Sequence, residues 1–314
     1  MLIPSVEIAL AQPIPAMTED SERQNLFALA ESVDLSGGRA IVEFGTFFGG
    51  STSCLLNGVL RNPTRNPAGQ NVVGYDAFRC HESSTLATHV HNAAKVGKLE
   101  HLLVNQDGWL IFGDVTRHCL QPFGNEVQLI SGDISQAEWS GRPIALLHID
   151  CPKSYNMLQP VLSRFLPFAT EGAVVIFQDF FYHWSATVIA TAQMLVEAGL
   201  IKYLNSQATS MTAIVSRRAT ADDIAKIDRA MQTADITALI DRTKIAARDI
   251  TIDRPDDFLP RLDLAKAQHF WSRGDYAKAK QSVADGIYAQ GSIRKNAVTD
   301  VLDLLQEGFV FDIR

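Results

Sequence analysis

The sequence lacks a long apolar run: no segment reaches the ~18 consecutive apolar residues that a membrane-spanning helix needs. It also lacks an export signal of the usual form. Residues 1–11 are mildly apolar, but they have no basic start, contain Glu7 and are too short for a typical signal peptide. We therefore expect a cytoplasmic protein without a membrane partner, in which residues 1–35 form an N-terminal helical arm.

Cysteine and positive charge are both scarce. The four cysteines have no C-x-x-C spacing, so a zinc site is not expected, and without an export signal they should be reduced thiols. Lys and Arg number 28 against 35 Asp and Glu, which gives a formal net charge of −7. Nucleic-acid binding needs a basic face, so we expect a small molecule or another protein as partner and no nucleic acid.

Short apolar runs are abundant, and most alternate with helical patterns. Such a pattern is typical of a parallel sheet covered on both faces. Two further runs, at 200–204 and 211–215, flank a polar segment and predict an antiparallel hairpin. The fold class is therefore α/β, a doubly wound Rossmann-like, mostly parallel sheet with a terminal hairpin. The predicted parallel strands are 40–44, 72–75, 127–131, 144–149 and 173–177.

The composition changes near residue 218, and only helical patterns follow. We predict three parts: the arm 1–35, the α/β domain 36–218 and a C-terminal helical module 219–314. Within the module, residues 264–288 resemble one tetratricopeptide-type helix pair, and one such pair cannot bury its own apolar face. The module is then a helical cap or a dimerisation module, and the second interpretation gives a homo-oligomer.

The segment after the first predicted strand contains the most informative motif. Gly45 allows a tight turn, Gly49 and Gly50 allow close approach of a ligand, and Ser51 is expected to cap the next helix. The Gly-x-x-x-Gly-Gly spacing differs from the dinucleotide-binding fingerprint. Glu43 lies inside the apolar strand, where an acid needs a partner such as an ammonium or backbone N–H groups.

This motif resembles that of class I methyltransferases, which use S-adenosylmethionine, and the resemblance spans residues 36–218. In that family the loop binds the methionine end of the cofactor, which implies this role for the five residues just named. The resemblance also implies that Asp76, at the end of the second strand, binds the ribose hydroxyls. Asp133, which follows the third strand, is implied to contact adenine. The ends of successive strands form the ligand crevice of such sheets.

Two further strands, expected to be neighbours, end in Asp150 and in the pair Gln178 and Asp179. These side chains can hold a divalent cation such as Mg²⁺ through oxygen ligands. Such a cation would lower the pKa of a bound hydroxyl and orient it for methyl transfer. Alternatively, Asp150 and Asp179 position the substrate directly.

The same segments resemble a narrower group, the O-methyltransferases that act on macrolide sugars and related natural products, with relatives in polysaccharide pathways. The chain keeps Asp150, Tyr155 and Asp179 of that pattern. It departs from the pattern at three positions, Cys151, Lys153 and Gln178. The resemblance implies S-adenosylmethionine-dependent methyl transfer to a small-molecule oxygen, with a sugar hydroxyl as one candidate acceptor.

Asp150, Lys153 and His183 are the candidate catalytic residues. His183 is the better base on its intrinsic pKa, whereas Lys153 is expected to bind an anionic substrate group or to pair with Asp150. An aromatic cluster around His183 either lines an apolar or sugar-stacking pocket or packs in the core. The cluster consists of Phe180, Phe181, Tyr182 and Trp184.

Two other function classes remain open from the sequence. One is a nicotinamide-dependent oxidoreductase on a similar sheet, which the loop spacing and the terminal hairpin disfavour. The other is a partner-binding protein that retains the fold without catalysis, which the departures at Lys153 and Gln178 favour. Residues 79–125 are longer than a simple crossover needs, and we expect them to cover a substrate pocket.

Overall fold

The structure is a computed structural model that describes residues 14–288. The chain divides into two compact units. The first comprises the described residues of Met1–Cys151 together with Phe168–Val174, and the second comprises Pro152–Pro167 with the described residues of Val175–Arg314. Residues 1–13 of the predicted arm and residues 289–314 of the predicted helical module lie outside the described residues. The predicted domain boundaries at 35 and 218 stay a prediction.

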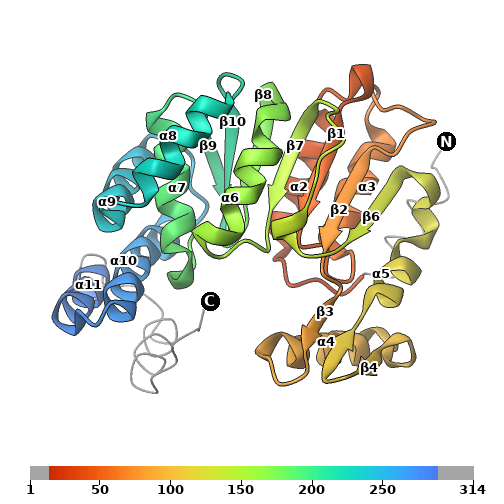
Figure 1. The fold of residues 1–314 in the computed structure, drawn as a ribbon, viewed down its shortest axis with the longest axis horizontal. Coiled ribbons are helices and arrows are strands. Elements are labelled where there is room, and N and C mark those ends of the chain that lie inside the picture. The colour runs from red at the N-terminus through yellow and green to blue at the C-terminus, as the bar shows by residue number, and fades with distance from the viewer. Residues whose placement is uncertain (1–13, 289–314) are drawn as a thin grey trace. The chain divides into compact units, whose positions relative to one another are not determined.

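The main sheet has seven strands in the order β6-β2-β1-β7-β8-β10-β9 (Figure 1). β1 pairs in parallel with β2 and β7, β2 pairs in parallel with β6, and β9 is antiparallel to β10. All five residues of β1 and all six of β7 are buried, as expected where helices cover both faces. The predicted fold class is therefore confirmed. The strands are β1 Ala40–Phe44, β2 Val72–Asp76, β6 Val127–Ser131, β7 Ile144–Ile149, β8 Ala169–Phe177, β9 Ile201–Gln207 and β10 Ser210–Val215.

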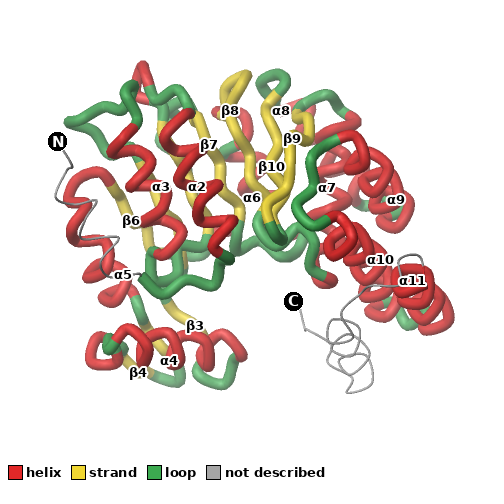
Figure 2. The backbone as a smooth tube through the Cα atoms, turned by 180° about the vertical axis from the view of Figure 1, so that it is seen from behind, coloured by secondary structure: helices red, strands yellow, loops and turns green. Residues whose placement is uncertain are grey.

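In the first unit, helices α2 (Asp20–Ser32) and α3 (Gly50–Arg61) lie side by side, as Figure 2 shows. Gly58 of α3 faces the backbone of α2, where a Cβ atom would collide with the Phe27 carbonyl oxygen. The N-cap of α2 is Glu19, whose backbone N–H donates to the Glu22 carboxylate at 2.9 Å, so an acid closes the first turn.

Residues 79–120 form a small structure with its own sheet, in the order β3-β5-β4 (Figure 1). The three strands of this small sheet were not predicted. A buried cluster that includes Val90, Leu110 and Phe112 forms the core of this segment. The elements are β3 Arg79–His81, α4 Thr85–Gly97, η2 Glu100–Leu102, β4 Val104–Gln106, β5 Trp109–Ile111, α5 Gly113–Leu120 and η3 Gln121–Glu126.

The connection from β6 to β7 differs from the prediction, because the helical pattern expected between them is absent. Residues 132–143 contain only the short turn η4 (Ile134–Gln136). A cavity of about 650 Å³ lies on the adjacent face of β2 and β6, lined by Val73, Tyr75 and Ile130 among others. One of its polar groups is bonded within the protein: the Tyr75 hydroxyl donates to the Glu138 carbonyl oxygen at 2.7 Å.

The second unit is mainly helical apart from the β8–β10 end of the sheet. Residues from Ala221 to Tyr288 contain four α-helices, in agreement with the predicted helical tail, and the pair at 264–288 corresponds to the end of α10 and to α11. No helix within residues 14–288 is long and apolar enough to span a membrane. The helices are α6 Tyr155–Arg164, α7 Ala186–Glu197, α8 Ala221–Met231, α9 Ile236–Ala246, α10 Pro255–Ser272 and α11 Tyr276–Tyr288, with short turns η5 Leu166–Phe168, η6 His183–Ser185 and η7 Ala247–Asp249.

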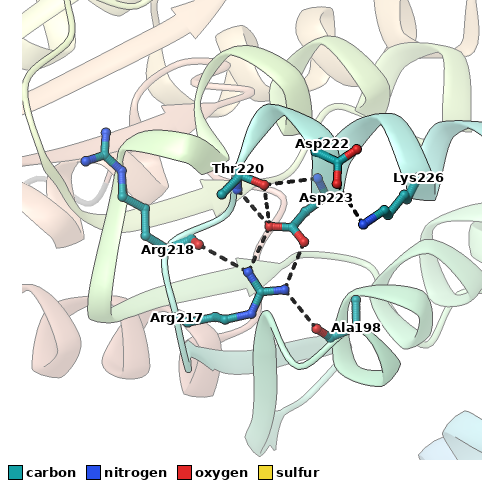
Figure 3. A network of polar contacts seen from close by, with 7 residues as sticks. All are labelled: Ala198, Arg217, Arg218, Thr220, Asp222, Asp223 and Lys226. Atoms are coloured by element: carbon teal, nitrogen blue, oxygen red, sulfur yellow. Dashed lines mark hydrogen bonds and ion pairs between the residues drawn. The ribbon is translucent and has the colours of Figure 1, made fainter.

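The segment between β10 and α8 is held by a polar network (Figure 3). The Arg217 guanidinium donates to both carboxylate oxygens of Asp223, at 2.8 and 2.9 Å, and to the Ala198 carbonyl oxygen at 3.2 Å. The Thr220 hydroxyl accepts the backbone N–H of Asp223 at 3.1 Å and so caps α8. The composition change near residue 218 therefore coincides with a fixed turn.

Candidate functional site

The loop between β1 and α3 has an unusual backbone. Gly45, Phe47 and Gly49 all have positive φ values, at 96°, 50° and 94°. Phe47 is the strained residue of the three, because a positive φ is unfavourable for a residue that has a side chain. Backbone strain of this kind often occurs at functional sites. The prediction that Ser51 caps the helix is wrong: Gly49 is the N-cap, α3 begins at Gly50, and Ser51 is buried in the first turn.

The glycines of this loop allow close approach of other parts of the protein. A Cβ atom on Gly45 would lie 2.9 Å from the Cys151 backbone nitrogen, and one on Gly49 would lie 2.8 Å from Leu120. A Cβ atom on Gly50 would collide with Ala16. The small residue is thus needed for packing at each position, and the cofactor-binding role of Gly45, Gly49 and Gly50 stays a prediction.

Glu43 is fully buried, with 0% of its surface exposed. Its carboxylate accepts a hydrogen bond from the Thr52 hydroxyl and lies 3.0 Å from His148 Nδ1. The predicted partners, an ammonium or backbone N–H groups, are therefore replaced by two side chains. The sequence analysis missed His148, although the β1–β7 register places it directly opposite Glu43. The signal was a histidine inside the apolar run Ile144–Ile149.

Asp76 lies at the end of β2 and holds two strained turns. One carboxylate oxygen accepts the Phe47 N–H at 2.8 Å and the other accepts the Phe78 N–H at 2.7 Å. Phe47 and Phe78 both have positive φ, at 50° and 49°. Burial raises the pKa of the Asp76 carboxyl to about 6, while these two N–H groups act in the opposite direction. Asp76 therefore faces the loop after β1, and its predicted role in ribose binding stays a prediction.

Two other acids lie at strand ends of the first unit. Asp133 is exposed and accepts the Ser135 N–H at 2.8 Å, which caps η4; this bond, with the nearby Arg79, lowers the pKa of its carboxyl. Asp150 follows β7, and its backbone N–H donates to the Phe44 carbonyl oxygen at 2.9 Å. The negative charges of Asp150 and Glu43 both contribute to the raised pKa of Asp76. The carboxyl ends of β1, β2 and β7 thus form one acidic region.

The remaining predicted residues belong to the second unit. Lys153 Nζ lies 2.6 Å from Asp179 Oδ2. The Ser210 hydroxyl donates to the side-chain amide oxygen of Gln178 at 2.7 Å. Asp179 has a φ of 57°, a further strained residue at the end of a strand. An ammonium on one predicted ligand does not suit a divalent cation. Among residues 14–288 no group of three or more His, Cys, Asp or Glu side chains is arranged to hold a metal ion.

The aromatic cluster after Asp179 has two parts. Phe180 and Phe181 are fully buried and pack in the core. Tyr182 and Trp184 are partly exposed, and their rings stack 4.3 Å apart at an interplanar angle of 7°. His183 begins η6, with its ring edge-on to Trp184 at 4.6 Å. Core packing is therefore observed for Phe180 and Phe181, and the pocket interpretation stays a prediction for Tyr182 and Trp184.

The family model described as "Methyltransferase domain" matches residues 42–180. This range begins in β1 and ends directly after Asp179, so it contains both the glycine loop and the two strand ends with candidate chemical residues. Residues 42–180, somewhat less than half of the chain, are thus similar to a methyltransferase domain. The predicted resemblance to class I methyltransferases is thereby confirmed for this domain.

Several solved structures resemble the chain. The cofactor-bound protein Rv0187 from MTB is 19% identical, with 68% of this chain and 91% of that chain covered and a TM-score of 0.42. The O-methyltransferase NovP is 15% identical, with coverage of 64% and 82% and a TM-score of 0.46. CalS11, a TDP-rhamnose 3'-O-methyltransferase, is 17% identical, with coverage of 67% and 93% and a TM-score of 0.37. A search of curated proteins found no match. With TM-scores below 0.5, these likenesses carry no argument about substrate.

Proposed function

We propose that the protein is an S-adenosylmethionine-dependent methyltransferase acting on an oxygen of a small molecule, with a sugar hydroxyl as the candidate acceptor. The observation that carries the proposal is Asp76 in the methyltransferase domain, at the end of β2 and bonded to the strained loop after β1. A carboxylate offers about four acceptor positions, and two backbone N–H groups use two of them. The two that remain suit the adjacent hydroxyls of a ribose.

The residues of the first unit fit the cofactor in part. Asp76 would hold the ribose, the exposed Asp133 would accept the adenine amino group, and backbone groups of the loop at 45–50 would hold the methionine portion. Glu43 would stabilise the loop without touching the cofactor, because its carboxylate is fully buried against Thr52 and His148. When bound, S-adenosylmethionine supplies an electrophilic methyl group on a sulfonium.

Methyl transfer to oxygen needs an aligned and deprotonated acceptor hydroxyl. His183 would take the proton, because imidazole titrates near neutral pH. Asp179, which lies in the same unit as His183, would orient the acceptor through a hydrogen bond to one of its hydroxyls. Lys153 is a poor base, since loss of its proton would break the ion pair with Asp179. The mechanism includes no metal ion, because the Asp179 carboxylate is held by an ammonium.

A second candidate function is partner binding without catalysis. The Lys153–Asp179 ion pair favours it, because the pair neutralises a carboxylate that the related enzymes keep at this position. In this case the domain binds the cofactor but transfers no methyl group. The oxidoreductase interpretation receives no support from the methyltransferase domain at 42–180.

Calorimetric titration with S-adenosylhomocysteine tests the cofactor assignment. We expect micromolar binding by the unmodified protein and at least about tenfold weaker binding by Asp76→Asn, since one lost charged hydrogen bond is worth about 1.5–3 kcal/mol. Asp114→Asn is the matched control, because Asp114 is exposed and pairs with Arg117 on α5. Absence of binding, or equal binding by both variants, would overturn the assignment. Binding without transfer to any hydroxyl acceptor supports the second candidate.

A further inference from the structure

The cavity on the face of β2 and β6 lies at one edge of the main sheet (Figure 1). Its floor consists of side chains from the two paired strands: Val73 and Tyr75 of β2, and Gln128 and Ile130 of β6. The parallel register pairs Val73 with Gln128 and Tyr75 with Ile130, and residues two apart in a strand point to the same face. The volume of about 650 Å³ is typical of a pocket that binds a small molecule.

The cavity exists because the connection from β6 to β7 does not cover this face with an α-helix. Crossover helices normally cover both faces of a doubly wound sheet, whereas residues 132–143 contain only the short turn η4. Asp76 follows Tyr75 in β2 and points to the opposite face, because successive side chains of a strand alternate. The cavity is therefore separate from the proposed ribose-binding acid.

Three hydrogen bonds hold the loop that forms one wall of the cavity. The Tyr75 hydroxyl donates to the Glu138 carbonyl oxygen at 2.7 Å, and the Trp139 indole N–H donates to the Arg142 carbonyl oxygen at 2.6 Å. The Arg142 guanidinium donates to the Gln70 carbonyl oxygen at 2.9 Å and lies 5.7 Å from the centroid of the Trp139 ring. The indole is thus held at the cavity before a ligand arrives, which lowers the entropy cost of binding.

The lining of the cavity has no net charge. Among the described residues that line it, Arg142 is the cation and Glu138 is the anion. Burial raises the pKa of the Tyr75 hydroxyl to about 12, so this group is neutral at physiological pH. A ligand with a net charge gains little attraction here, and the cavity therefore suits an uncharged one.

The polar and aromatic groups of the lining match a sugar. Three carboxamide side chains line the cavity, and none of them bonds to a described residue: Gln70, Asn125 and Gln128. A carboxamide both donates and accepts hydrogen bonds, as a sugar hydroxyl does. Trp139 is partly exposed and offers an apolar ring surface on which the C–H face of a sugar can pack.

We propose that this cavity binds a neutral sugar, with the C–H face of the sugar on Trp139 and its hydroxyls bonded to the three carboxamides. The site lies on the sheet face opposite Asp76 and takes no part in methyl transfer. It goes beyond the proposed function and stands whether or not the protein binds a cofactor. It gives the protein a non-catalytic contact with carbohydrate.

The test is saturation-transfer NMR of the full chain with the methyl glycosides of glucose, galactose and mannose, a method that detects millimolar binding. We expect at least one of the three to bind, and Trp139→Ala should weaken its binding at least about fivefold. Trp109→Ala is the matched control, because Trp109 is an exposed tryptophan of the same unit that does not line the cavity. This variant should bind as the unmodified protein does.

Gln128→Leu is a second variant in case Trp139→Ala does not fold. It keeps the size of the side chain and removes an amide that no described residue bonds, so binding should weaken several-fold without loss of folding. The methyl glycoside of glucuronate, a charged sugar, should bind no more tightly than the neutral glycosides.

Three results would overturn the inference: no binding of any neutral glycoside, tighter binding of the glucuronate glycoside, or equal binding by the Trp139 and Trp109 variants. Trp184→Ala tests the candidate acceptor region of the second unit. Loss of glycoside binding in this variant, with binding kept in Trp139→Ala, would assign the sugar to that region and contradict the site on β2 and β6.

Discussion

A buried acid in a strand can suggest a ligand, but its partner can also be a side chain of the same protein, as Glu43 shows. Glu43 lies in a strand that is otherwise apolar, and its carboxylate bonds to Thr52 and lies against His148. A buried carboxylate without such partners would be strongly destabilising. The acid therefore supports the strand-to-helix turn, and Asp76 is the acid with acceptor positions to spare.

Asp76 makes stability depend on pH. Its folded pKa of about 6 is above the unfolded value near 3.9, so the folded state binds more protons between these values. The free energy of unfolding should therefore fall as pH rises from about 4 to about 6, by up to about 3 kcal/mol from this residue. Asp76→Asn should flatten this part of the profile, as measured by urea unfolding at several pH values. An unchanged slope in the variant would contradict the assignment of the raised pKa to Asp76.

At the scale of elements, the turn from β1 to α3 depends on backbone that only glycine accepts easily. Gly45 has φ at 96° and a Cβ atom there would lie 2.9 Å from the Cys151 nitrogen, whereas Gly172 has φ at 82° and nothing within 4 Å. Gly172→Ala should therefore show strain alone, about 1 kcal/mol, and Gly45→Ala should cost about 2–3 kcal/mol or more. Chemical denaturation measures both, and equal losses would show that close approach to Cys151 does not matter.

The elements also show which patterns predict structure. Runs of four to six mainly apolar residues predicted β1, β2, β6 and β7, because a strand buried on both faces needs such a run. The strands β3, β4 and β5 have three residues each, too few for a period to be visible. The connection from β6 to β7 was predicted as helical, yet its residues form a turn capped by Asp133.

At the scale of the whole molecule, the tail packs as part of the second unit. Helix α9 lies on α7, where the Thr243 hydroxyl donates to the Gln193 side chain at 3.2 Å, and Phe258 of α10 packs on Phe181. A chain that ends at Arg218 should therefore expose apolar surface of α7 and lose cooperative thermal unfolding or solubility relative to the full chain. Unfolding at an unchanged temperature would instead show that the tail is a separable module.

The sequence by itself determined the sheet, the hairpin, the helical tail and the methyltransferase resemblance, because strand runs and a glycine loop are local patterns. Only the tertiary structure decided which side chains meet. In the structure Glu43 lies against His148, Lys153 pairs with Asp179, and the Arg261 guanidinium lies over the Tyr182 ring. These residues are far apart in the chain, and their contacts follow from strand register and helix packing, which no short stretch of sequence specifies.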